Sequence, residues 1–300
     1  MTRFKTLLLR EWMQHRFGWL VLMGLPFVLF AAVALFGQAQ IQLDDSEEPM
    51  ALTVAGGIVL GVIATTLVLA WGASLLQTPG LARRDAQDRS VEFWLSLPAG
   101  HAQSIGTTLL AHLILLPVAA LGVGLVGGLI VSLPVVTHAF GVGAWFALPW
   151  AQLLVAFAAV TLRLALGVVL ATLWLSPLIL VTMAASAWLK RWGIPAVAAV
   201  FGLGGLLLDR LYGNAVVWNV LGGLVQQASR ALIATERHGE MAFAIERQAD
   251  IPALLSHAAA WCALDAGHAL AMLASPAFLA AIAVAAGAFA LLVLRGQRGS

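Results

Sequence analysis

The stretch from Pro149 to Trp188, PWAQLLVAFAAVTLRLALGVVLATLWLSPLILVTMAASAW, contains 40 residues and a single charged side chain, Arg163. If the stretch is wholly helical, it is about 60 Å long, roughly twice the thickness of the hydrocarbon core of a bilayer. We therefore expect either one helix that projects beyond the bilayer or an interfacial piece that leads into a span beginning near Leu164. Pro177 predicts a kink, because proline lacks the backbone N–H and clashes with the preceding turn.

The rest of the chain has the same character. Of its 300 residues, 61% are hydrophobic and 10% are charged, whereas about a quarter of the residues in a soluble domain are charged. Repeated apolar runs near 20 residues long predict an all-α polytopic membrane protein. The net charge of +2 is spread over membrane-flanking segments, which gives no reason to expect a nucleic-acid partner. Cys262 is the single cysteine, which excludes an internal disulfide and a cysteine zinc site.

Six transmembrane spans fit the apolar pattern within one permease domain, residues 1–300. We place them at 17–37, 51–76, 104–131, 153–189, 193–209 and 276–295. Residues 1–16 precede the first span, and Phe4, Leu8 and Trp12 fall on one helical face of this segment, opposite Arg3, Arg10 and Gln14. This pattern is typical of a basic amphipathic helix that lies on the inner leaflet.

The orientation follows from the lysines and arginines in short loops. The loops 38–50 and 132–148 contain neither residue type, whereas the segments at 1–16, 81–101, 190–191 and 295–298 each contain lysine or arginine. This distribution predicts that both termini are cytoplasmic and that residues 210–275 form a long extracytoplasmic segment between spans five and six. Gly57 with Gly61, and Gly124 with Gly128, are spaced for close helix approach. We interpret both pairs as ordinary packing within the chain rather than as a dimer seam.

The common catalytic motifs are missing from the sequence. It contains no GxxxxGK[ST] phosphate loop, no HExxH and no GxSxG. We expect no catalytic, cofactor-binding or metal-binding residue on this chain. His257, Asp265 and His268 could suggest a metal or proton site, but an interfacial structural role is favoured for them, and Glu236, His238 and Glu240 fit a solvated helix face.

Arg163 is the candidate intramembrane polar site. A charge inside the membrane is a functional candidate, but if the fourth span begins at Leu164, the side chain of Arg163 would extend to the outer interface. Both interpretations remain open. The spans contain no chain of buried acids, and the sequence has no convincing inverted repeat. A secondary transporter is therefore disfavoured.

The densest cluster of charge is at residues 81–101, LARRDAQDRSVEFWLSLPAGH. In a helix, Arg84–Asp88 and Asp85–Arg89 are attractive i,i+4 pairs, whereas Asp88–Glu92 is repulsive. Val91, Trp94 and Leu95 share one face, and Pro98 ends the helix. The pattern favours a short amphipathic element parallel to the membrane between spans two and three. A solvated loop with an interfacial tryptophan is the alternative.

This segment, together with LLLREWMQHRFGW near the N-terminus and the order of the spans, resembles the permease subunits of type-2 ATP-binding cassette (ABC) exporters. The family has a GT-x-E-x-L-L-S-x-P type of signature before its third span. Here Glu92 stands at the glutamate, Leu95 and Ser96 at the leucine-serine element, and Pro98 at the proline, while Arg89-Ser90 replaces the Gly-Thr pair. The sequence also matches a DRS-x-x-FW-x-SLP variant of the signature.

The resemblance implies a six-span half-transporter of the bacterial inner membrane that pairs with a second copy or a paralogue. It also implies a separate ABC ATPase subunit that carries ATP and Mg²⁺, so that no cofactor is expected on this chain. The cytoplasmic coupling helix would contact that subunit. Its expected coupling residues are Arg84, Asp85, Asp88, Arg89, Glu92, Phe93, Trp94, Leu95 and Pro98.

From the resemblance we expect an exporter subunit that transmits ATP hydrolysis to substrate movement, with residues 210–275 as a lid over the exit. An ion-gradient-driven secondary transporter is the alternative, and an intramembrane enzyme that uses His257, Asp265 and His268 is a weaker one. A non-transporting immunity or sensor subunit that still binds an ATPase is a further alternative. The sequence does not indicate the substrate, and a mostly apolar cavity would suit lipids, peptides or hydrophobic drugs.

Overall fold

The computed structural model describes residues 2–36, 47–87, 100–233 and 251–298, and these residues are almost entirely helical, with no strand among them. This confirms the predicted all-α class. Five helical segments are long and apolar enough to cross a membrane, which supports a multi-pass membrane protein. They are Phe4–Val33, Met50–Ala82, His101–Phe140, Trp150–Tyr212 and Pro276–Gln297.

The described residues form a series of α-helices with single π-helical or 3₁₀ turns between some of them. In chain order they are α1 (Thr2–Phe36), α2 (Glu47–Gln87), α4 (His101–Leu110), the π-helical turn η1 (Ala111–Leu115), α5 (Leu116–Phe140), α6 (Val142–Ala147), α7 (Trp150–Leu189), the 3₁₀ turn η2 (Lys190–Trp192), α8 (Gly193–Ala198), the π-helical turn η3 (Ala199–Leu203), α9 (Gly204–Tyr212), α10 (Val216–Leu232), α11 (Ile251–Ala271), the 3₁₀ turn η6 (Met272–Ala274) and α12 (Pro276–Arg298).

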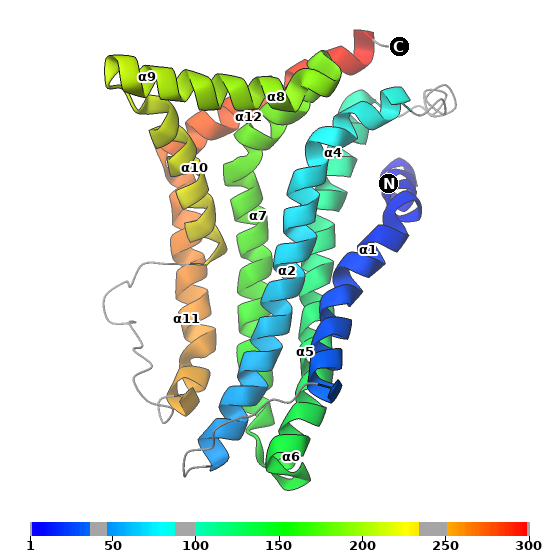
Figure 1. The fold of residues 1–300 in the computed structure, drawn as a ribbon, viewed down its shortest axis with the longest axis vertical. Helices are drawn as coiled ribbons and strands as arrows, with labels where there is room; N and C mark the ends of the chain where they lie inside the picture. The colour runs from blue at the N-terminus through cyan, green and yellow to red at the C-terminus, as the bar shows by residue number, and fades with distance from the viewer. Residues whose placement is uncertain (1, 37–46, 88–99, 234–250, 299–300) are drawn as a thin grey trace.

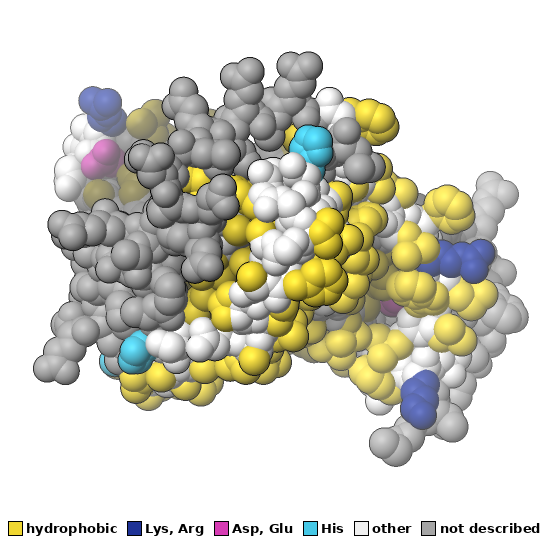
Figure 2. All heavy atoms as spheres, turned by 90° about the horizontal axis from the view of Figure 1, so that it is seen from below, with side chains coloured by type: hydrophobic (Ala, Val, Ile, Leu, Met, Phe, Trp, Pro, Cys, Tyr) yellow, Lys and Arg dark blue, Asp and Glu magenta, His cyan; other side chains and the backbone are white. Residues whose placement is uncertain are grey.

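The long helices form a bundle with two distinct ends, which we name as they stand in Figure 1. The upper end holds the last turns of α2 and α7, the start of α4 and the C-terminus. At the lower end, α2 and α7 begin, and the short helix α6 joins α5 to α7. Seen from the lower end, the described surface is largely hydrophobic, with lysine and arginine only toward the edges of the view (Figure 2). Along the long helices, large hydrophobic side chains such as Val33, Val68 and Val284 are exposed, as they are on the lipid-facing surface of a membrane bundle.

The helices α2 and α5 pack closely along their length. A Cβ atom added to Gly128 would lie 2.7 Å from the Cα of Val59, and one added to Gly124 would lie 2.9 Å from the Cα of Ile63. The two glycines therefore let the α5 backbone lie directly on α2, as small residues do in membrane bundles. The prediction of packing within the chain is confirmed for this pair. Gly57 has no contact of this kind within 4 Å.

Residues 2–16, predicted as an interfacial helix, form the first part of α1, which is continuous from Thr2 to Phe36. The polar face of this part is turned into the bundle, where Arg10 is 8% and Glu11 0% exposed at the side chain. Phe4 and Trp12, by contrast, are about half exposed. The polar side chains of α4 face α1 and form hydrogen bonds with its polar groups. These groups can therefore be buried without losing their hydrogen-bond partners.

The fourth predicted span is one unbroken 40-residue helix, α7, which continues through Pro177. The chain then turns sharply at Lys190, whose φ of 53° is the one positive value at a non-glycine among the described residues. A Cβ atom at Gly193 would meet the backbone of Ser186 and Ala185, so this turn requires glycine there.

The predicted fifth span, 193–209, is helical but does not run along the bundle. α8, η3 and α9 cross its upper end, almost perpendicular to α7 (Figure 1). Val200, Leu203 and Leu211 are largely exposed there. In the predicted outer segment, 210–275, α10 starts at the upper end and both α10 and α11 pack along α7. Hydropathy identifies apolar helices but not the direction in which each one lies, which explains the lateral course of α8 and α9.

Candidate functional site

The predicted coupling segment is flanked by two helices at the upper end of the bundle. α2 ends at Gln87 and α4 begins at His101, so the intervening residues join two neighbouring elements of that end. Arg84 and Asp85 lie in the last turn of α2. The other expected coupling residues lie outside the described residues; they are Asp88, Arg89, Glu92, Phe93, Trp94, Leu95 and Pro98.

Arg163 lies inside the bundle, bound to two other helices. Its Nε donates a hydrogen bond of 2.6 Å to Oδ2 of Asp265 on α11, and the side chains of the two residues are 3% and 7% exposed. Its Nη1 donates to the carbonyl oxygens of Ala231 and Leu232 at the end of α10, at 3.0 and 3.3 Å. Arginine therefore joins α7, α10 and α11 through one buried guanidinium.

This geometry bears on the two interpretations of Arg163. A side chain that is 3% exposed and paired within the protein favours the intramembrane polar site over a side chain that extends to the outer interface. A Cβ atom at Gly167, one turn further along α7, would lie 2.6 Å from the carbonyl oxygen of Leu232. Because residue 167 is glycine, α10 comes close enough to α7 for its last carbonyl oxygens to accept hydrogen bonds from Arg163.

Asp265 is therefore one half of an ion pair rather than the centre of a histidine site. His257 contacts the Oγ of Ser256 through Nδ1 at 3.0 Å. Within the described ranges, neither His257 nor His268 forms a potential metal-binding group with Asp265. Glu236, His238 and Glu240 lie outside the described residues.

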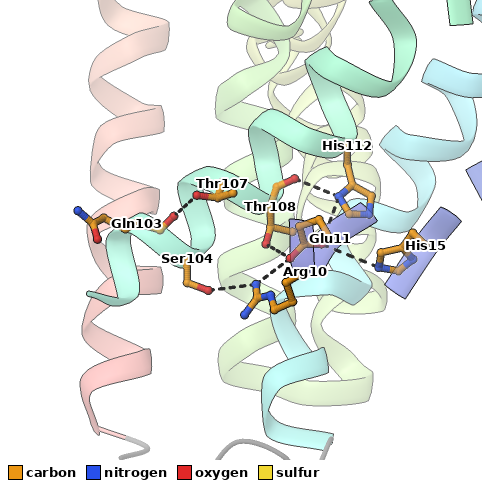
Figure 3. A network of polar contacts seen from close by, with 8 residues as sticks. All are labelled: Arg10, Glu11, His15, Gln103, Ser104, Thr107, Thr108 and His112. Carbon is orange, nitrogen blue, oxygen red and sulfur yellow. Dashed lines mark hydrogen bonds and ion pairs between the residues drawn. The ribbon is translucent and has the colours of Figure 1, made fainter. Parts of the chain in front are cut away.

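A second buried polar cluster joins α1 to α4 and η1, and the sequence analysis did not identify it (Figure 3). Its centre is the carboxylate of Glu11, which is fully buried. Oε1 accepts hydrogen bonds from Nη2 of Arg10 at 2.7 Å and from Oγ1 of Thr108 at 3.0 Å. Nη2 of Arg10 also donates to Oγ of Ser104 at 3.3 Å.

The other carboxylate oxygen faces two imidazoles. Oε2 of Glu11 lies 4.0 Å from Nε2 of His15 and 3.9 Å from Nδ1 of His112. His112 is fully buried, and its Nδ1 lies 3.0 Å from the carbonyl oxygen of Thr108. Because a carbonyl oxygen only accepts, Nδ1 carries the hydrogen, which leaves the lone pair of the neutral ring on Nε2.

The indole ring of Trp19 packs against both histidines. Trp19 is stacked on His15 with the ring centroids 6.0 Å apart, and it meets His112 edge to face at 5.2 Å. The two imidazoles are themselves edge to face at 4.8 Å. His15 is partly exposed, whereas Trp19 is buried. The cluster therefore has an apolar wall at Trp19, and His15 is more exposed than Arg10, Glu11 or His112.

The spacing of these residues is the signal that could have revealed the cluster. Glu11 and His15 are one helical turn apart, and Ser104, Thr108 and His112 recur at every fourth position. Each set lies on one helical face, and both sets are polar within apolar helices. Only the packing of α1 on α4 shows that the two faces meet.

An apolar cavity of about 460 Å³ lies between α7, η3, α10 and α12. Trp174, Pro177 and Phe201 contribute to its lining, and Asn219 and Gln227 are its amide side chains. Its volume is within the range of pockets that hold small organic ligands, about 300–1,000 Å³.

Comparison of the chain with protein-family models, with curated proteins and with solved structures returned no match. The resemblance to exporter permeases therefore rests on the quoted motifs alone.

Proposed function

We propose that this chain is the membrane-spanning subunit of an ABC transporter of the exporter type, located in a bacterial inner membrane with both termini in the cytoplasm. It would act with a second permease copy or a paralogue and with a separate ATPase subunit that binds ATP and Mg²⁺. The upper end of the bundle would then be its cytoplasmic end.

The observation that carries the proposal is the motif DRSVEFWLSLP together with the position of its flanks. The motif resembles the coupling signature of these permeases, and the helices on either side of it, α2 and α4, meet the same end of the bundle. The lack of a phosphate loop in the sequence agrees with an ATPase on another chain.

The described contacts supply a route for coupling. α4 follows the motif directly, and its polar face is bound to Arg10 and Glu11 of α1. The ring of His101, at the first residue of α4, lies close to Gly296 of α12. A displacement of the motif by the ATPase would therefore move α4 and, through these contacts, α1 and α12 as well.

The apolar cavity beside α10 supports transport of a hydrophobic compound, since its walls are almost entirely hydrophobic. A secondary transporter is the second candidate function. It is favoured by the buried ionisable groups of the bundle, Arg163 with Asp265 and Glu11 with its histidines, because such groups are typical of ion and proton pathways.

Affinity purification of the tagged chain from native membranes tests the proposal. We expect a phosphate-loop ATPase to co-purify and transport into vesicles to require ATP. Trp94→Ala and Glu92→Arg should each reduce the co-purified ATPase by roughly 30-fold, because a tryptophan or charged anchor at an interface contributes about 2 kcal/mol or more.

Trp192→Ala is the matched control. Trp192 is an exposed tryptophan at the same end of the bundle but outside the motif, so its replacement should leave ATPase binding unchanged. If both motif variants retain the ATPase at wild-type level, residues 81–101 are not the coupling helix. Transport driven by an ion gradient without any ATPase would favour the secondary transporter.

A further inference from the structure

We propose that Glu11, His15 and His112 form a binding site for a divalent transition-metal ion of the Zn²⁺ class, located between α1 and the π-helical turn η1. The inference concerns this chain alone and does not depend on the proposed transport function. Among the described residues, these three are the one group whose potential ligand atoms all lie within 4.8 Å of one another.

The donor set suits Zn²⁺. Two imidazoles and one carboxylate, with a fourth position open to water, are a recurrent zinc ligand set in proteins. The ligand atoms would lie about 2.0–2.2 Å from the ion. Oε2 of Glu11 lies 4.0 Å from Nε2 of His15, too far for a hydrogen bond, and 3.9 Å from Nδ1 of His112, the ring nitrogen that faces the Thr108 carbonyl. The side chains would therefore have to rotate to bring Nε2 of both histidines and Oε2 of Glu11 to bonding distance.

The surrounding hydrogen bonds are those that orient metal ligands. A metal-binding histidine typically donates its second ring N–H to a carbonyl or carboxylate, and a ligating carboxylate is itself hydrogen-bonded. Here Nδ1 of His112 donates to the carbonyl oxygen of Thr108, so that Nε2 is the ligand atom. Arg10 and Thr108 both donate to Oε1 of Glu11, which leaves Oε2 directed toward the histidines.

The local charge and access are also compatible with a cation. Arg10 neutralises Glu11, so a divalent ion would bring two positive charges into the cluster. A hydroxide or another anion in the fourth position would compensate part of this charge. The partly exposed His15 gives water a path to that position, while the buried Trp19 packs against both histidines. The bound ion would join α1 to the helix that follows the coupling motif.

Zinc titration of the full-length chain, purified in detergent without a polyhistidine tag, tests the site. We expect one equivalent of Zn²⁺ to bind in competition with a chelating dye and to raise the melting temperature. Co²⁺ in place of Zn²⁺ should give the visible absorption of a four-coordinate site. His112→Asn and His15→Ala should each weaken Zn²⁺ binding by at least tenfold, and Thr108→Val by about 10–100-fold through loss of the bond that orients Glu11.

His138→Ala is the matched control, because His138 is an exposed histidine near the end of α5. It should bind Zn²⁺ like the wild type. His112→Asn keeps an N–H donor for the Thr108 carbonyl, so its metal-free melting temperature should stay near that of the wild type. If the wild type binds no equivalent of Zn²⁺, or if His112→Asn and His15→Ala bind it as tightly as His138→Ala does, the proposal is wrong.

Discussion

At the residue scale, the ion pair between Arg163 and Asp265 is the clearest case of a charge retained inside an apolar bundle. Three hydrogen bonds link three helices at this point, since Arg163 also donates to the last two carbonyls of α10. Removing two charges together from a buried pair is often tolerated, whereas removing one of them leaves the other uncompensated. The pair therefore contributes more to specificity of packing than its own attraction suggests.

Asp265→Ala should lower the free energy of unfolding by about 3–5 kcal/mol, because it leaves the guanidinium of Arg163 buried without its carboxylate. The double variant Arg163→Met with Asp265→Leu should be clearly more stable than Asp265→Ala. Thermal unfolding in detergent measures both effects. Asp209→Ala, at a partly exposed position of α9, is the control and should change stability little. Equal losses in the single and double variants would contradict the buried-pair account.

At the scale of elements, two glycines of α5 decide how closely this helix approaches α2. Gly124 and Gly128 lie against the α2 backbone at Ile63 and Val59, so the contact is between main chains rather than between side chains. Gly122 belongs to the same helix, but a Cβ atom there would meet nothing within 4 Å. Glycine-to-alanine substitutions can therefore be compared at Gly128, which contacts α2, and at Gly122, which does not.

Gly128→Ala should destabilise the protein by about 1–3 kcal/mol, because the added methyl group forces α5 away from α2. Gly122→Ala should be neutral or stabilising by up to about 1 kcal/mol, because alanine favours the helix where space is open. Thermal unfolding of the two variants side by side provides the measurement. A loss at Gly122 as large as that at Gly128 would mean that close packing on α2 is not the cause.

At the scale of the whole molecule, the direction of the α8–α9 helix sets the topology. Arg191 and Tyr212 flank this helix, and it lies across the upper end of the bundle, whereas α6 lies at the lower end. Both residues should therefore be reached from the same side of the membrane. A transmembrane helix over 193–209 would instead place Tyr212 on the side of α6.

Single cysteines in a Cys262→Ala background distinguish the two topologies. Arg191→Cys and Tyr212→Cys should react with a membrane-impermeant maleimide only after cells are permeabilised, if the upper end is cytoplasmic as proposed. Gly143→Cys, in the exposed part of α6, should react in intact cells. The cysteine-free chain is the control for background. If Tyr212→Cys reacts in intact cells as Gly143→Cys does, residues 193–209 cross the membrane as a fifth span.

By itself, the sequence determined the all-helical class, the membrane character and the close packing of Gly124 and Gly128, because hydropathy and residue size act locally along each helix. It also drew attention to Arg163 as a lone charge in a 40-residue apolar run. Only the tertiary structure decided that Arg163 pairs with Asp265, 102 positions away, and that Glu11 and His15 face His112. The physical reason is that a polar residue in an apolar helix must find partners inside the protein, but its own helix does not specify which helix supplies them. The lateral course of α8 and α9 was decided in the same way, by the turn at Lys190 and Gly193 rather than by composition.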